Sequence, residues 1–202
     1  MIRAVLCDLD GVIRDWTDQD DAGIEHQFGL PPGELKGIAF DPELLRSAIT
    51  GEISDQEWRE QIVDRLRERH PGVDAGGAVA AWSEPAGTID EETLDLVQQV
   101  RKRAPVTLVT NATSRLDHDL ARLGVSDAFD HIVNSSVVGA AKPDRAIFDH
   151  ALALVGANAG ETLYIDDTER YHGPAAGFGL ICHHFRGTEG LREALTTHGL
   201  IP

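Results

Sequence analysis

Short apolar runs recur along the chain, each bounded by loop-type residues and separated from the next by a helical pattern. The runs lack the alternation of polar and apolar residues that marks a strand with one face in water. Near-continuous apolar strands are typical of a parallel sheet covered on both faces. The pattern therefore predicts an α/β fold with a doubly wound, mostly parallel, Rossmann-like sheet. The five expected strands are residues 4–8, 106–110, 131–134, 163–166 and 180–185.

Amphipathic segments supply the expected helices between these strands. Residues 90–103 and 113–123 each place leucine or valine on one face, and Gly124 follows the second segment as a C-cap. Residues 143–155 begin with Pro143, and proline is favoured at the first helical position. We therefore expect helices on both faces of the sheet.

A long segment after the first strand interrupts this alternation. As far as residue 82 it contains helical signals but no convincing strand. The clearest signal is a capping box from Ser54 to Glu57, which predicts a helix that ends before Pro71. An all-helical segment in this place predicts an inserted cap. We expect a core domain of residues 1–13 and 87–202 and a helical cap domain of residues 14–86.

Two aspartates follow the first expected strand. Ligands of open parallel sheets bind at the carboxyl ends of the strands, and Asp8 and Asp10 lie there two residues apart. Two carboxylates this close do not readily both ionise unless a cation intervenes. The pair therefore suits one nucleophile or metal ligand and one general acid and base.

Polar residues also end the other expected strands. Thr110 and Asn111 end the second, Asp166 and Asp167 end the fourth, and Lys142 follows the third at the start of the expected helix. A helix N-terminus favours anions, and a lysine there suits a point contact to a phosphate or carboxylate oxygen. We expect Asn111 to face the same pocket as Thr110. Together these strand ends predict one functional site.

The charge balance narrows the choice of partners. The 202 residues include 18 basic and 34 acidic ones, which gives a formal net charge of −16. Nucleic acids and anionic membranes bind basic patches, so we expect neither as a partner. The two cysteines, Cys7 and Cys182, do not make a disulfide framework, and no apolar run approaches the roughly 18 residues of a membrane span. We expect a cytoplasmic protein, monomeric or homodimeric.

The ordered set of strand-end residues resembles the four motifs of the haloacid dehalogenase (HAD)-like hydrolase superfamily. Asp8-Leu9-Asp10-Gly11-Val12 is similar to the first motif, Thr110 to the second, Lys142 to the third, and Asp166-Asp167 to the fourth. Residues 141–148 are also similar to a pattern of members with a helical cap after the first motif. The resemblance covers essentially the whole chain.

The resemblance implies a role for each motif residue in phosphoryl transfer. Asp8 would attack phosphorus and form an aspartyl-phosphate, while Asp10 would protonate the leaving oxygen and then deprotonate water. Thr110 would hold a phosphate oxygen, and Lys142 would restrain both the phosphate and Asp8. Covalent catalysis of this kind splits one difficult step into two easier ones.

The resemblance also implies a Mg²⁺ site. Its ligands would be the side chains of Asp8 and Asp166 and the backbone carbonyl of Asp10, with Asp167 binding directly or through water. Oxygen ligands suit this hard cation. Tyr171 stands where many family members carry asparagine, which affects the surroundings of the metal rather than the metal itself.

The second aspartate favours phosphate chemistry over dehalogenation, because a halide leaves without a proton and dehalogenases typically lack Asp10. We therefore expect a phosphatase acting on a small phosphorylated metabolite, such as a sugar phosphate or a nucleotide. Arg14 and Trp16 could line its entrance. The alternatives are a phosphomutase acting on a sugar phosphate, a 2-haloacid dehalogenase and a non-catalytic phosphate-sensing module.

Overall fold

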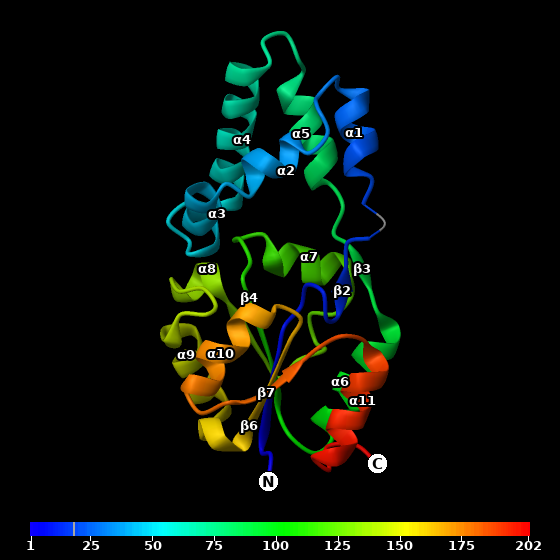
Figure 1. Ribbon diagram of the computed structural model, residues 1–202, viewed down its shortest axis with the longest axis vertical. Helices are drawn as coiled ribbons and strands as arrows, with labels where there is room; N and C mark the ends of the chain where they lie inside the picture. The colour runs from blue at the N-terminus through cyan, green and yellow to red at the C-terminus, as the bar shows by residue number, and fades with distance from the viewer. Residues whose placement is uncertain (18) are drawn as a thin grey trace.

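The computed structural model describes residues 1–17 and 19–202. A five-stranded sheet in the order β5-β4-β1-β6-β7 occupies the lower half of Figure 1. Every pairing in it is parallel, so the carboxyl ends of the strands lie at one edge. The strands are β1 (Ala4–Cys7), β4 (Val106–Thr110), β5 (His131–Asn134), β6 (Thr162–Asp166) and β7 (Ile181–His184).

Helices cover both faces of this sheet, which explains why its strands are apolar throughout. Successive side chains of a strand point to opposite faces. In β1, Val5 and Cys7 join one apolar cluster and Leu6 joins the other. The first cluster includes α6 (Glu91–Arg101), α7 (Leu116–Arg122) and α11 (Thr188–Thr197). The second includes α8 (Ser135–Val138), α9 (Arg145–Val155), the 3₁₀ turn η1 (Ala159–Glu161) and α10 (Glu169–Gly177).

Five helices form a separate layer beyond the carboxyl edge of the sheet, at the top of Figure 1. We call α1 to α5 the helical layer. Its helices are α1 (Asp21–Gln27), α2 (Glu34–Ala39), α3 (Pro42–Ile49), α4 (Asp55–Arg69) and α5 (Ala75–Ser83). A third apolar cluster, drawn from residues between Ile24 and Trp82, holds it together. The expected division of the chain at residues 14–86 stays a prediction.

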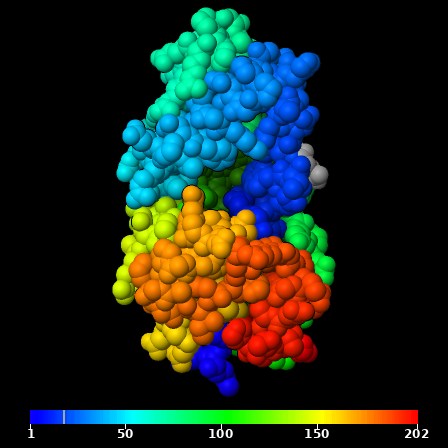
Figure 2. Space-filling model, viewed as in Figure 1, coloured from blue at the N-terminus to red at the C-terminus, as the bar shows by residue number. Residues whose placement is uncertain are grey.

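Two short antiparallel strands, β2 (Arg14–Asp15) and β3 (Thr88–Ile89), lie where the chain enters and leaves the helical layer. Side chains also join this layer to the sheet domain. Thr113 donates a hydrogen bond to Asp55 of α4 at 2.8 Å, and the Arg115 guanidinium donates to the backbone oxygens of Ser83 and Glu84. Figure 2 shows a recess between the two parts of the molecule.

The structure confirms the expected α/β architecture and corrects some boundaries. Every sheet strand agrees with its expected range to within one residue at each end. The helix expected at residues 113–123 begins only at Leu116, since Thr113 turns toward Asp55 instead. The helix expected from Pro143 begins at Arg145, because Asp144 has an extended backbone with ψ of 136°. The segment after β1 does contain a strand, the two-residue β2, which is too short to form an apolar run.

The capping box at the start of α4 is present as expected. The Ser54 side chain accepts from the Glu57 N–H, while Glu57 accepts from the Ser54 N–H at 2.7 Å. The helix ends at Arg69, just before Pro71. None of the helices in the described part of the chain is long and apolar enough to span a membrane.

Candidate active site

The predicted site residues meet at the carboxyl edge of the sheet. Asp8 directly follows β1, Thr110 ends β4 and Asp166 ends β6. These three strands are neighbours in the sheet, with β1 in the centre. All three side chains are buried, so the sheet carries polar groups at this edge despite its apolar strands.

The Lys142 ammonium joins the two buried aspartates. Its Nζ lies 2.7 Å from an oxygen of Asp8 and 2.7 Å from an oxygen of Asp166. Burial opposes protonation of Lys142, but the two carboxylates outweigh it and raise the lysine pKa. The ammonium therefore stays charged, and two carboxylates share one positive charge.

Asp8 differs from an ordinary surface aspartate in its electrostatics. Burial raises its pKa to about 7, although Lys142 opposes the shift. Its Oδ1 accepts a 2.7 Å hydrogen bond from the Leu9 N–H, which fixes the carboxylate. A buried, fixed carboxylate whose charge is not fully compensated is arranged to bind a cation or to attack an electrophile.

Asp166 is fixed from several sides. The Tyr164 hydroxyl donates to its Oδ2, the same oxygen that contacts Lys142, and the Thr168 N–H donates to its Oδ1 at 2.8 Å. A ring nitrogen of His172 lies 3.0 Å from its backbone oxygen. The side chain thus has one defined orientation.

Asp167 adds an exposed carboxylate to this group. Oxygens of Asp8, Asp166 and Asp167 all lie within 4.8 Å of one another. Gly11 permits this approach, because a Cβ at that position would lie 2.1 Å from Asp167 Oδ2, and its φ of +78° also favours glycine. Three clustered carboxylates against one ammonium leave excess negative charge, and an all-oxygen donor set suits Mg²⁺.

The Asp10 carboxylate is held by Arg14 of β2 and by Trp16, which directly follows that strand. Its Oδ1 accepts hydrogen bonds from Arg14 Nε at 2.7 Å and from Trp16 Nε1 at 2.6 Å, while Oδ2 accepts from Arg14 Nη2 at 2.9 Å. The Arg14 side chain is only 6% exposed and its Nη1 lies 3.6 Å from Asp119. Asp10 is therefore oriented by a buried guanidinium and is not one of the three clustered carboxylates.

Asn111 positions Lys142 through the backbone. Its amide accepts from the Lys142 N–H at 2.7 Å and donates to the Lys142 carbonyl at 3.0 Å. It also donates to the Tyr171 hydroxyl at 3.3 Å, and the Tyr171 ring lies 5.5 Å from Lys142 Nζ. Contacts of Thr110 and Asn111 with a substrate stay predictions.

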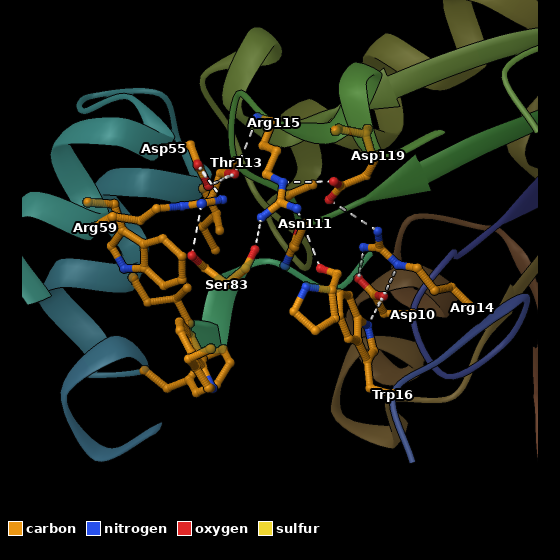
Figure 3. A pocket seen from close by; sticks show the side chains of 18 of the residues that line it. Asp10, Arg14, Trp16, Asp55, Arg59, Ser83, Asn111, Thr113, Arg115 and Asp119 are labelled. Carbon is orange, nitrogen blue, oxygen red and sulfur yellow. Dashed lines mark hydrogen bonds and ion pairs between the residues drawn. The ribbon is translucent and has the colours of Figure 1, made fainter. Parts of the chain in front are cut away.

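A cavity of about 520 Å³ lies between this edge and the helical layer (Figure 3). Its lining includes Asp10, Arg14, Trp16 and Asn111 from the sheet side, together with residues of α2 to α5. Arg14 and Trp16 thus line this cavity, and their place at a substrate entrance stays a prediction. Asp10 stands at the boundary between the carboxylate cluster and the cavity.

Several residues that shape the site were not expected from the sequence. The sequence indicates Tyr164 only as a residue of an apolar strand, yet its hydroxyl donates a hydrogen bond to Asp166. Arg115 and Asp119 form an ion pair of 2.7 Å beside Arg14, and their i, i+4 spacing on an expected helix was the available signal. The available signal for Tyr164 was its spacing from Asp166, because side chains two residues apart lie on the same face of a strand.

Comparison with known proteins gives consistent matches. A family model described as haloacid dehalogenase-like hydrolase matches residues 2–177. The chain is 34% identical over 115 residues to the pyrimidine 5'-nucleotidase YjjG of Escherichia coli (strain K12), covering 53% of this chain and 51% of that protein. It therefore spans about half the length of this relative.

Two further similarities cover nearly the whole chain. The sesquiterpene phosphatase astK of Aspergillus oryzae is 22% identical over 205 residues, covering 98% of this chain and 96% of that protein. A HAD family enzyme, bt-2542 of Bacteroides thetaiotaomicron, was solved in complex with magnesium and inorganic phosphate. It matches with a TM-score of 0.72 at 23% identity, covering 91% of this chain and 93% of that one, which shows a shared fold. With a family model matched over residues 2–177, this chain belongs to the haloacid dehalogenase-like hydrolases.

Proposed function

We propose that this hydrolase is a magnesium-dependent phosphatase that cleaves a small phosphomonoester through a phosphorylated Asp8. One observation carries the proposal. The Asp8 carboxylate lies 2.7 Å from the Lys142 ammonium and within 4.8 Å of the oxygens of Asp166 and Asp167. A nucleophile, a fixed cation and an oxygen donor set for a metal thus occupy one sheet edge.

The proposed first step uses Asp8 as the nucleophile. An Asp8 oxygen forms a bond to phosphorus while the bond from phosphorus to the ester oxygen breaks. Asp10 gives its proton to the leaving oxygen, which departs as an alcohol. Lys142 donates to the phosphoryl oxygens and to Asp8, and Thr110 holds a further phosphoryl oxygen.

The second step regenerates the enzyme. Water attacks phosphorus, Asp10 accepts the proton of that water, and the bond from phosphorus to Asp8 breaks to give inorganic phosphate. The hydrogen bonds from Arg14 and Trp16 hold the Asp10 carboxylate in place for these proton transfers. Uncatalysed hydrolysis of phosphomonoesters is extremely slow, so a large rate enhancement requires the nucleophile, the acid and base, and the cations together.

The donor set supports magnesium as the metal. Asp8, Asp166 and Asp167 would hold it together with the Asp10 backbone carbonyl. When bound, Mg²⁺ would neutralise the charge of the phosphoryl oxygens. Lys142 alone supplies one positive charge to two buried carboxylates, so the cluster has the capacity for a divalent cation.

The position of the helical layer supports a small substrate. We propose that residues 14–86 act as a cap over the site, which would admit a phosphorylated metabolite and exclude macromolecules. Asp10 disfavours dehalogenation, because halide needs no proton to leave. YjjG is named a pyrimidine 5'-nucleotidase and astK a sesquiterpene phosphatase, so the two relatives do not point to one leaving group.

Phosphate release from phenyl phosphate with Mg²⁺ tests the proposal. We expect turnover by the wild-type protein, and its loss by at least about a thousandfold both in Asp8→Asn and on removal of Mg²⁺ with a chelator. Exposed Asp149→Asn on α9 is a matched control that removes a carboxylate far from the cluster. Full activity of Asp8→Asn would disprove the assigned nucleophile.

The same assay separates the alternatives. A phosphomutase would isomerise a sugar phosphate with little phosphate release, and a dehalogenase would release halide from a 2-haloacid. A phosphate-sensing module would bind phosphate with Mg²⁺ but turn over none of the esters. Any of these results, in place of phosphate release, would overturn the phosphatase.

A further inference from the structure

Aromatic and aliphatic side chains form the walls of the cavity beyond Asp10. Phe40 packs edge-on against Trp82 with ring centroids 6.3 Å apart, and Trp82 packs against Trp58 at 5.9 Å. Leu45 and Ile49 of α3 continue this wall. Phe40 is 50% exposed, although most large apolar side chains of the protein are buried. An apolar surface kept open above the site is available to a ligand.

The N–H groups of the three indoles that line this cavity are engaged within the protein. Trp58 Nε1 donates to the Ala39 carbonyl at 3.2 Å, Trp82 Nε1 donates to Asp21 at 2.9 Å, and Trp16 Nε1 donates to Asp10. Each N–H is therefore already used within the protein. What remains for a ligand is apolar surface and the capacity for stacking.

The uncharged polar side chains of the lining are also occupied. Ser83 donates to the Val79 carbonyl at 2.7 Å, and Thr113 donates to Asp55. Gln19 donates to Asp21 and to the Trp82 carbonyl, while both ends of the Asn111 amide bind the Lys142 backbone. These bonds reduce the hydrogen-bonding capacity that is left for a sugar or a nucleobase, although two buried guanidinium nitrogens of the lining, Arg14 Nη1 and Arg59 Nε, have no hydrogen-bond partner among the described residues.

The cations of the lining are paired as well. Arg59 contacts Asp55 at 2.8 Å, Arg115 contacts Asp119 at 2.7 Å, and Arg14 is bound to Asp10. Lys36 pairs with Asp21. Among the described lining residues, each cation therefore already has a carboxylate partner, so a second anionic group on the substrate would find no free charge.

Resting on the proposed phosphatase activity, we propose that this cavity binds the leaving group of the substrate and that this group is an uncharged, largely apolar alcohol, aryl or isoprenoid. Asp10, which would protonate the leaving oxygen, lines the cavity, whereas the clustered Asp8, Asp166 and Asp167 do not. An ester bound with its phosphate at the cluster thus extends its alcohol into the cavity. The volume of about 520 Å³ lies within the range of pockets that enclose small organic ligands.

A series of n-alkyl phosphates tests this inference, because ethyl, butyl, hexyl and octyl phosphate have leaving groups of similar basicity. We expect kcat/KM for phosphate release with Mg²⁺ to rise roughly three- to fourfold per methylene until the cavity is full. Glucose 6-phosphate, also the ester of a primary alcohol, and uridine monophosphate should react at least tenfold more slowly than hexyl phosphate. A flat alkyl series, or faster reaction of either polar ester, would overturn the inference.

A pair of esters distinguishes the two kinds of apolar alcohol. Benzyl phosphate and cyclohexylmethyl phosphate differ in the ring that would meet the indole faces. Faster reaction of the benzyl ester assigns an aryl alcohol, and equal or slower reaction assigns an aliphatic, isoprenoid one. Geranyl phosphate then checks the second assignment directly.

Phe40→Ala removes part of the apolar wall without opening the buried core, since the ring is half-exposed. We expect the ratio of kcat/KM for octyl phosphate to that for ethyl phosphate to fall at least tenfold, mainly through KM. Leu154→Ala is the matched control, because Leu154 is 42% exposed and lies on α9 outside the cavity. An equal ratio in the two variants would contradict the assigned wall.

The outcomes also separate this inference from the proposed function. Phosphate release from every ester without preference overturns the apolar leaving group alone. If no ester, phenyl phosphate included, is hydrolysed, the phosphatase proposal fails, and tryptophan fluorescence then tests the cavity. All three tryptophans of the chain line it. Saturable changes in emission with benzyl alcohol or geraniol, but not with glucose, support the apolar site, and the reverse overturns it.

Discussion

At the scale of single residues, Asp8 and Asp10 show how one strand end places two carboxylates in different environments. Asp8 is buried, and its neighbour is the ammonium of Lys142. Asp10 is 38% exposed in its side chain and is held by Arg14 and Trp16. The first is fixed beside a cation where phosphorus would be attacked, and the second faces the cavity where a leaving group would need a proton. Separation of roles by environment is a general way to obtain a nucleophile and an acid from identical side chains.

Gly11→Ala tests the close approach of Asp167 to the first strand end. The added Cβ would lie 2.1 Å from Asp167 Oδ2, so that carboxylate must move. We expect the affinity for Mg²⁺ to fall roughly ten- to a hundredfold, measured by calorimetric titration. Gly139→Ala is the control, because Gly139 has the same φ of +78° but open space around the added atom. Equal Mg²⁺ affinities in the two variants would contradict the assigned role of the close approach between position 11 and Asp167.

His183 predicts how stability depends on pH. Burial lowers the pKa of His183 below its usual 6.5, and the neighbouring His172, His184 and His198 act in the same direction. The folded state then binds this proton less readily than the unfolded chain. The contribution to stability is therefore complete above about pH 6.5 and is lost as pH falls through the folded pKa.

Chemical denaturation at pH 7.5 and pH 5.5 measures this effect. We expect the free energy of unfolding to decrease at the lower pH, and to decrease less in His183→Gln. The exposed His150→Gln variant on α9 should retain the full decrease. The interpretation would be wrong if the His183 variant lost as much stability as the wild type.

At the scale of elements, the sheet could be predicted because burial on both faces leaves a direct trace in the sequence. The runs from Val106 to Thr110 and from His131 to Asn134 match their strands at both ends. Helix starts were less predictable, since they depend on distant partners. Thr113 binds Asp55, 58 residues away in the chain, and α7 therefore begins later than its apolar pattern indicates.

The same distinction applies to the candidate site. Asp8 and Asp166 could be predicted because one directly follows a strand and the other ends one, and parallel strand ends meet at one edge. Lys142 lies beyond α8, so its prediction depended on its place before the expected helix and on the resemblance. The contact of Arg14 with Asp10 could not, because it depends on the turn between β1 and β2. The hydroxyl of Tyr164 was also missed, because a tyrosine in an apolar strand is expected first as a core residue.

The capping box of α4 gives a prediction for the helical layer. Ser54→Ala removes the acceptor for the Glu57 N–H and should lower the free energy of unfolding by about 1 kcal/mol. Chemical denaturation measures the change, and Ser54→Asp should restore most of it because aspartate also caps. Gln56→Ala, an exposed substitution at the second residue of α4, serves as control. A loss of the same size in the control would show that the cap contributes nothing particular.

At the scale of the whole molecule, the net charge of −16 opposes the capture of anionic substrates. Within the proposed site this repulsion would be reduced, because Lys142 and a bound divalent cation would offset the charge of the clustered carboxylates. Charges are also compensated locally in the cavity, since Arg59 and Arg115 each form an ion pair with an aspartate. Attraction of the phosphate is thus expected at short range only, inside a molecule whose long-range field repels it.

Ionic strength separates these two fields. At a fixed concentration of free Mg²⁺, added monovalent salt screens the long-range repulsion over roughly 10 Å at 0.1 M. We expect kcat/KM for a phosphomonoester to rise by roughly two- to threefold between 20 and 200 mM salt, while kcat stays constant, because only capture depends on the long-range field. A fall in kcat/KM over the same range would mean that the local positive charge dominates at long distance. Octyl phosphate serves as the substrate, because salt strengthens apolar binding only slightly at these concentrations. Glycerol, added so that all samples have the same viscosity, controls for diffusion.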